Sequence, residues 1–106
     1  MNVLVTGSSS GIGRECALLF LEKGYDVYGI DVKEDTIKHP HYTHFSQDVR
    51  EKANLPAIDD ISILVTSAGV QNSTDDISIN LKGTINTVEK YGVKEGIKSI
   101  LMISSA

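Results

Sequence analysis

Four short apolar runs constrain the fold of this chain more than any other feature of its sequence. They cover residues 3–5, 27–30, 61–65 and 100–103, and each is bounded by turn or charged residues. Runs that are continuously apolar, without alternation, are typical of strands buried on both faces, as in parallel sheets covered by helices. Residues 42–46 predict one further short strand between the second and third runs.

The segments between these runs carry helical patterns. Residues 12–23 predict a helix that ends at Gly24, and its buried face is expected to consist of Ile12, Cys16, Leu19 and Phe20. A second helix is expected from residue 77 to about residue 91, after a capping-box pattern at 73–76. Alternating strands and helices predict an α/β fold with an open parallel sheet and right-handed crossovers. Ligands of such sheets bind beyond the carboxyl ends of the strands.

Length, charge and composition exclude several classes of protein. The 106 residues predict one domain, spanning 1–106, with one core. Ten basic against 14 acidic residues give a net charge of −4, and without a basic run we expect no nucleic-acid partner. No segment approaches the ~20 apolar residues of a membrane span, and the first residues lack the features of a secretory signal. We therefore expect a cytoplasmic protein without a membrane partner.

Disulfide and metal chemistry are not expected either. Cys16 is the single cysteine and cannot form an intramolecular bridge. His39, His41 and His44 do not have a metal-ligand spacing, because residues 41 and 44 of a strand point to opposite faces. We expect no metal site.

A glycine-rich turn, Thr6-Gly7-Ser8-Ser9-Ser10-Gly11-Ile12-Gly13, joins the first apolar run to the first predicted helix. Unpaired N–H groups and a partial positive charge at a helix N-terminus favour a pyrophosphate, provided that glycines let it approach the backbone. Gly7 suits the tight turn, Gly11 the close approach, and Gly13 the packing of helix on strand. A purely structural strand-to-helix turn is the alternative for such a loop.

Two other functions of this turn are rejected on chemical grounds. The segment 7–11 formally matches the Gly-x-Ser-x-Gly nucleophile elbow, but no earlier strand-helix loop precedes it to supply the second oxyanion donor. A nucleoside-triphosphate loop needs Gly-Lys followed by a hydroxyl residue. Neither a lysine nor a hydroxyl residue follows Gly11 or Gly13 in the required place.

The spacing Gly-x-x-x-Gly-x-Gly, preceded by Thr6, resembles the cofactor loop of the short-chain dehydrogenase/reductase family. That resemblance implies a Rossmann-type sheet of five strands in the order 3-2-1-4-5, with helices on both faces. It implies an NAD(P)-dependent oxidoreductase that interconverts a hydroxyl and a carbonyl of a small-molecule substrate by hydride transfer. In this turn the resemblance implies cofactor binding by Gly7, Ser9, Ser10, Gly11, Ile12 and Gly13.

Asp31 stands eighteen residues after Gly13, at the end of the second apolar run. A carboxylate there can accept hydrogen bonds from the adenosine ribose hydroxyls. It would also repel a 2′-phosphate, by about 4 kcal/mol for charges ~4 Å apart at an effective dielectric of 20. The sequence therefore predicts NAD as the cofactor, with NADP less favoured, although the basic residues Lys33 and Arg14 lie nearby.

Later landmarks of the resemblance follow in family order. Asp48-Val49 is similar to the family segment whose Asp binds the adenine amino group, and Ala68-Gly69 to small residues against which a cofactor ribose lies. Thr66 and Ser67 stand where the family has two asparagines. Asn80 resembles the family residue that holds a water of the proton relay, and Ser105 resembles the serine that stabilises charge on the substrate oxygen.

The catalytic Tyr-x-x-x-Lys pair of the family has no counterpart in these 106 residues, and the resemblance places it about a dozen residues beyond Ser105. We therefore expect a truncated chain, an incomplete domain that carries the cofactor-binding half of a longer enzyme. A non-catalytic dinucleotide-binding module is the alternative. The resemblance further implies a homo-oligomer.

Overall fold

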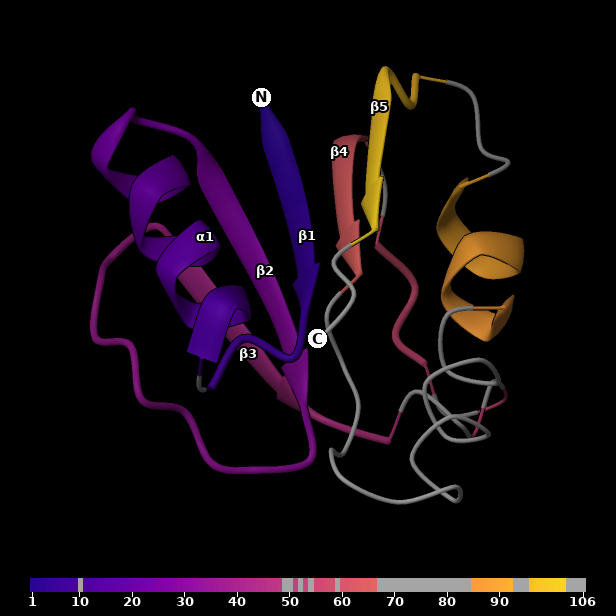
Figure 1. The fold of residues 1–106 in the computed structure, drawn as a ribbon, viewed down its shortest axis with the longest axis horizontal. Coiled ribbons are helices and arrows are strands. Elements are labelled where there is room, and N and C mark those ends of the chain that lie inside the picture. Colours follow the sequence, from indigo (N-terminus) through magenta and orange to yellow (C-terminus); the bar gives the residue numbers. More distant parts are fainter. Residues whose placement is uncertain are drawn as a thin grey trace.

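A computed structural model describes residues 1–9, 11–48, 51, 53, 55–58, 60–66, 85–92 and 96–102 (Figure 1). Along the chain its elements are β1 (Asn2–Thr6), α1 (Gly11–Glu22), β2 (Asp26–Asp31), β3 (Tyr42–Ser46), β4 (Ile61–Thr66), the π-helix η2 (Val88–Gly92) and β5 (Ser99–Met102). Strands thus form at all four apolar runs and at residues 42–46, as the sequence predicts; residue 103, the last of the fourth run, lies outside the described part of the chain.

The five strands form one sheet in the order β3-β2-β1-β4-β5, and every neighbouring pair is parallel. The order confirms the predicted Rossmann-type topology. Because all pairs are parallel, the carboxyl ends of the strands lie at one edge of the sheet, where α1 also begins (Figure 1). This edge is where the fold predicts a ligand site.

Alternate residues of the strands pack into two cores, one on each face of the sheet. Val3 and Val5 of β1 pack with Ala17 and Leu21 of α1, whereas Leu4 points to the opposite face and packs in one cluster with Tyr91 of η2. Helices therefore cover both faces, as expected. Burial on both faces explains why the inner strands β1, β2 and β4 contain continuous apolar runs.

A β-bulge at the start of β4 keeps the apolar residues of that strand on the correct faces. Asn2 of β1 pairs with Ile61, but the next residue, Val3, pairs with Ile63. The bulge shifts the alternation by one residue. Ile61 and Leu64 consequently lie in the same core cluster, although they are three positions apart in the strand.

The buried face of α1 differs from the predicted one. Gly13, Ala17 and Leu21 face the sheet, whereas Ile12 and Leu19, which were expected inside, are 57% and 51% exposed. Gly13 and Ala17 have little or no side chain, so this row of residues, spaced by four, permits a close approach of α1 to β1 and β2. The periodicity of the large apolar residues therefore predicts the wrong face; Cys16 and Phe20 are only partly buried at the edge of the core.

Residues 32–41 connect β2 to β3 without a helix and fold back along α1 (Figure 1). Ile37 anchors this segment, because its side chain is 3% exposed and packs into the core beneath α1. The Asp35 carboxylate accepts a hydrogen bond of 2.7 Å from the Ile37 amide and pairs with the Lys38 ammonium at 3.6 Å.

The second predicted helix is described only near its end. Residues 77–84 lie outside the described part of the chain, 85–87 are helical, and the helix continues into η2. The Tyr91 hydroxyl donates to the Pro56 carbonyl oxygen, and burial raises the pKa of this tyrosine. Among the described helices, none has the length and apolar character required to cross a membrane.

We predict that Ile37→Ala lowers the free energy of unfolding by about 2–4 kcal/mol, because it leaves a cavity under the connecting segment. Val32 belongs to the same segment but is 64% exposed, so Val32→Ala is the matched control, with an expected change within about 0.5 kcal/mol. Urea unfolding followed by circular dichroism measures both values. Equal losses for the two variants would contradict the anchoring role of Ile37.

Candidate functional site

The turn between β1 and α1 depends on glycines in the left-handed region. Gly7 has a φ of 73° and Gly11 a φ of 60°. Residues with a β-carbon rarely adopt such angles, whereas glycine does so without a steric cost. The Gly7 amide donates to the Ile30 carbonyl oxygen at 2.7 Å, which fixes the turn against the end of β2.

The N-terminus of α1 can accept an anion. The first N–H groups of an α-helix have no partner within the helix and carry a partial positive charge. No acidic residue lies in the first turn of α1 to neutralise that charge. Gly11 is exposed, and a β-carbon built on it would meet nothing within 4 Å, so a ligand has open space at this backbone.

Asp31 holds its carboxylate beside the turn by bonds from two backbone amides. Its Oδ2 accepts a hydrogen bond of 3.0 Å from the Ser9 amide, and its Oδ1 accepts one of 2.9 Å from the Lys33 amide. Each carboxylate oxygen can accept a second hydrogen bond. Because Asp31 is only half-buried, the carboxylate is oriented and still able to accept from a hydroxyl ligand.

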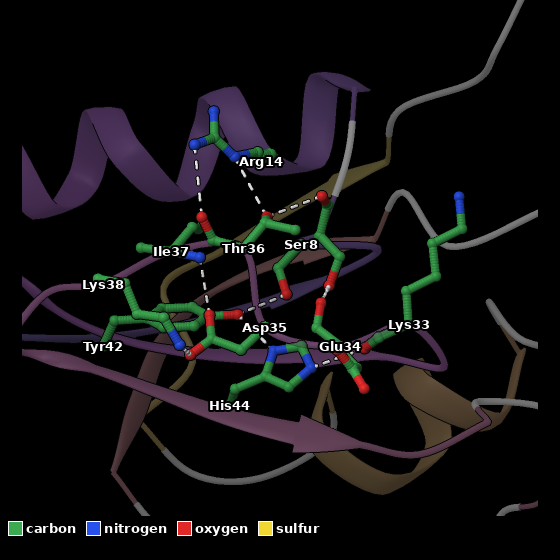
Figure 2. Close-up of polar contacts among 11 residues, drawn as sticks. Ser8, Arg14, Lys33, Glu34, Asp35, Thr36, Ile37, Lys38, Tyr42 and His44 are labelled. Carbon is green, nitrogen blue, oxygen red and sulfur yellow. Dashed lines mark hydrogen bonds and ion pairs between the residues drawn. The ribbon is translucent and has the colours of Figure 1, made fainter.

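Ser9 joins the turn to the segment after β2 through all of its polar groups. Besides its amide bond to Asp31, its hydroxyl donates to the Glu34 carbonyl oxygen at 2.8 Å, and its carbonyl accepts from the Thr36 hydroxyl at 2.8 Å. Arg14 of α1 donates to the Thr36 hydroxyl through Nε at 3.2 Å (Figure 2). The turn, the start of α1 and residues 31–36 therefore form one bonded unit.

A second set of polar contacts lies under the turn, and the sequence analysis missed it. The Ser8 hydroxyl is 2.7 Å from the Tyr42 hydroxyl, which is 2.8 Å from Nδ1 of His44 (Figure 2). Nε2 of His44 is 3.0 Å from the Lys33 carbonyl oxygen. Burial raises the pKa of Tyr42 to about 12; the hydrogen bond with Ser8 lowers it, and the charges of Asp35 and Asp31 raise it. The sequence does contain one indication of this contact: Tyr42 and His44 stand two residues apart in a predicted strand, and such residues lie on the same face of a sheet.

The other predicted cofactor residues are only partly described. Gly13 is buried against the sheet, and Ile12 is exposed beside the turn. Asp48 follows the end of β3, and its carbonyl oxygen accepts from the Glu51 amide at 3.0 Å. The following predicted residues lie outside the described part of the chain: Ser10, Val49, Ala68, Gly69, Asn80 and Ser105.

Comparisons with known proteins agree with this geometry. A family model described as short chain dehydrogenase matches residues 1–105. An NAD-dependent glycerol dehydrogenase of Listeria innocua is 36% identical over 114 residues, covering 84% of this chain and 45% of that protein. Ligand-free aldohexose dehydrogenase of Thermoplasma acidophilum superposes with a TM-score of 0.79 at 29% identity, over 98% of this chain and 49% of the other.

A further similar structure is that of the Bordetella bronchiseptica enzyme WbmH in complex with NAD+. It has a TM-score of 0.68 and 25% identity, over 84% of this chain and 34% of that enzyme. The chain spans less than half the length of each of these three relatives. With a family model that matches nearly every residue, a matching strand order and a glycine turn at the carboxyl edge of the sheet, this chain belongs to the short-chain dehydrogenase family.

Proposed function

We propose that this chain binds NAD and serves as the cofactor-binding half of an NAD-dependent dehydrogenase or reductase. The observation that carries the proposal is the bond between the Ser9 amide and the Asp31 carboxylate. It sets an acceptor for ribose hydroxyls directly beside a helix N-terminus that favours phosphate. A dinucleotide presents these two groups, a diphosphate and an adenosine ribose, next to each other.

Each predicted residue then has a distinct part in binding. The amides of Gly11, Ile12 and Gly13 at the start of α1 hold the diphosphate, while Gly7 gives the turn its shape. Ser9 orients the Asp31 carboxylate, which accepts from the ribose hydroxyls. The family resemblance assigns the remaining contacts to residues 10, 48–49 and 68–69, which would support one phosphate, the adenine and the second ribose.

The carboxylate of Asp31 favours NAD over NADP. A 2′-phosphate would lie against this carboxylate, and like charges at short range repel. The Listeria innocua relative is named as NAD-dependent, which supports the same choice. Each oxygen of the half-exposed Asp31 carboxylate accepts a hydrogen bond from a backbone amide. Among the described residues no side-chain cation is bonded to it, so its negative charge remains effective toward a ligand.

Hydride transfer is proposed for a polypeptide that contains this chain together with the Tyr-x-x-x-Lys pair of the family. The nicotinamide ring, when bound, accepts or gives the hydride. The resemblance assigns Ser105 to the substrate oxygen and Asn80 to a water of the proton relay, and it implies a small alcohol or carbonyl substrate and a homo-oligomer. NAD reduction by the longer polypeptide in the presence of alcohols tests this step, and binding without turnover would favour a non-catalytic module.

We predict that Gly11→Ala weakens NADH binding at least tenfold. Its methyl group would stand in the space open to the diphosphate, and the φ of 60° would be strained. Gly24→Ala is the matched control, because Gly24 also has a positive φ, 88°, and nothing within 4 Å of a β-carbon, but lies at the other end of α1. Fluorescence titration with NADH measures both affinities.

Thermal unfolding is the companion measurement for these two variants. Both substitutions should cost stability by a similar amount, about 1–2 kcal/mol, because each strains one left-handed residue. NADH affinity should fall in Gly11→Ala alone. A Gly11→Ala protein that binds NADH as tightly as Gly24→Ala does would remove the phosphate site from the turn.

Asp31→Asn is predicted to weaken NADH binding about tenfold or more, since a charged hydrogen bond contributes about 1.5–3 kcal/mol. NADPH binding should fall less or improve, because the repulsive charge is gone. Asp35→Asn is the control: it removes the same charge four residues away and keeps the oxygen that accepts from the Ile37 amide. Equal dissociation constants for NADH and NADPH in the unaltered protein would refute the NAD preference.

A further inference from the structure

Ser8 lies in the middle of the phosphate-binding turn. Its hydrogen-bond partner belongs to β3, a strand that is not a neighbour of β1. Its side chain is fully buried, and its hydroxyl bonds to Tyr42, which stands at the start of β3. In the sheet order, β2 separates β3 from β1. The Tyr42 side chain must therefore pass over β2 to reach the turn.

Gly29 of β2 provides the space for this crossing. It is buried and pairs in register with Val5 of β1 on one side and His44 of β3 on the other. A β-carbon on Gly29 would overlap both the Tyr42 hydroxyl and Oγ of Ser8. The missing side chain at Gly29 thus makes room for a polar contact on the face of the sheet that α1 covers.

The partners fix the direction of each hydrogen bond when His44 is neutral. The Lys33 carbonyl oxygen can only accept, so Nε2 of His44 carries the hydrogen and donates. Nδ1 is then an acceptor, and the Tyr42 hydroxyl donates to it. The oxygen of Tyr42 in turn accepts from the Ser8 hydroxyl. The high pKa of Tyr42 keeps its hydroxyl protonated for this purpose at physiological pH.

Three consecutive residues of the turn are thereby tied to different parts of the fold. Gly7 donates to the main chain of Ile30, Ser8 to the side chain of Tyr42, and Ser9 to the carboxylate of Asp31. Of these three hydrogen bonds, the one from the buried Ser8 hydroxyl reaches a side chain that lies under the turn, that of Tyr42. Loss of it would leave the buried Ser8 hydroxyl without this partner, and an unsatisfied buried polar group disfavours the present shape of the turn.

We propose that Tyr42, held by His44, is a positioning residue that fixes the phosphate-binding turn in the shape that accepts the diphosphate of the cofactor. The proposal rests on the proposed NAD binding and adds to it residues of β3 that do not touch the cofactor. A turn that is already in its binding shape saves the cost of ordering on association. The effect of Tyr42 must therefore appear in ligands that carry the diphosphate.

The test compares ligands with and without phosphate on the purified chain. Tyr42→Phe removes the bridging hydroxyl; NADH and ADP should bind about tenfold more weakly, whereas the affinity for adenosine should stay within about twofold. Tyr25→Phe is the matched control, because Tyr25 stacks on Phe20 before the first residue of β2, far from the turn. It should leave all three affinities unchanged.

His44 offers a rescue experiment that a merely structural role would not pass. Asn at position 44 can place an acceptor near the position of Nδ1, so His44→Asn should keep NADH affinity within about threefold of the unaltered protein. His44→Leu has similar bulk but no acceptor, and it should lose affinity about as strongly as Tyr42→Phe does. Ser8→Ala gives a second, smaller way to remove the contact and should show the same dependence on phosphate.

The outcomes separate this proposal from the one before it. If the unaltered chain binds neither NADH nor ADP, the proposed NAD function is overturned, and this inference falls with it. If NADH binds and both Tyr42→Phe and Ser8→Ala leave its affinity unchanged, only the positioning role is overturned. A loss that is equal for adenosine and ADP also overturns it, because the turn would then not be the part that Tyr42 positions.

Discussion

The site depends on the position of β1 between two parallel partners. β1 is bonded to β2 on one edge and to β4 on the other, and Val3, Leu4 and Val5 are completely buried. The register pairs Thr6 with Ile30, so the next residues along the chain, Gly7 after β1 and Asp31 at the end of β2, arrive at the same level. The glycine turn and the carboxylate therefore meet because the strands are parallel and in this register.

Residues 32–41, which connect β2 to β3, hold the glycine turn in place at the same edge of the sheet. The segment has no helix, yet it is fixed at one point in the core by Ile37 and at several points to the turn by Ser9, Thr36 and Arg14. The glycine turn and the Asp31 carboxylate, which we propose bind phosphate and ribose, are consequently parts of one bonded unit rather than two loops that happen to be close. Their direct contact is the hydrogen bond from the Ser9 amide to the Asp31 carboxylate.

The strands were predicted correctly from the sequence, whereas the buried face of α1 was not, and both outcomes have physical reasons. The inner strands β1, β2 and β4 are buried on both faces and appear in the sequence as apolar runs, so they were found from the sequence. The edge strands β3 and β5 are more exposed but were also predicted, and the strand order followed from the family resemblance. The face of α1 was wrong because Ile12 and Leu19 are large and apolar, while the sheet selects the small residues Gly13 and Ala17. Apolar periodicity measures hydrophobicity, whereas close packing of a helix on a sheet also requires small size.

The sequence by itself determined the chemical groups of the candidate site: a glycine turn after the first strand and an acidic residue at the end of the second. The spacing of these residues is characteristic of one family. Only the tertiary structure decided how these groups are held. The bond from Ser9 to Asp31 crosses 22 residues, and the contact from Ser8 to Tyr42 crosses 34 residues and passes over Gly29. Such contacts depend on strand register and on an absent side chain in a neighbouring strand, and no local pattern along the chain encodes either of them.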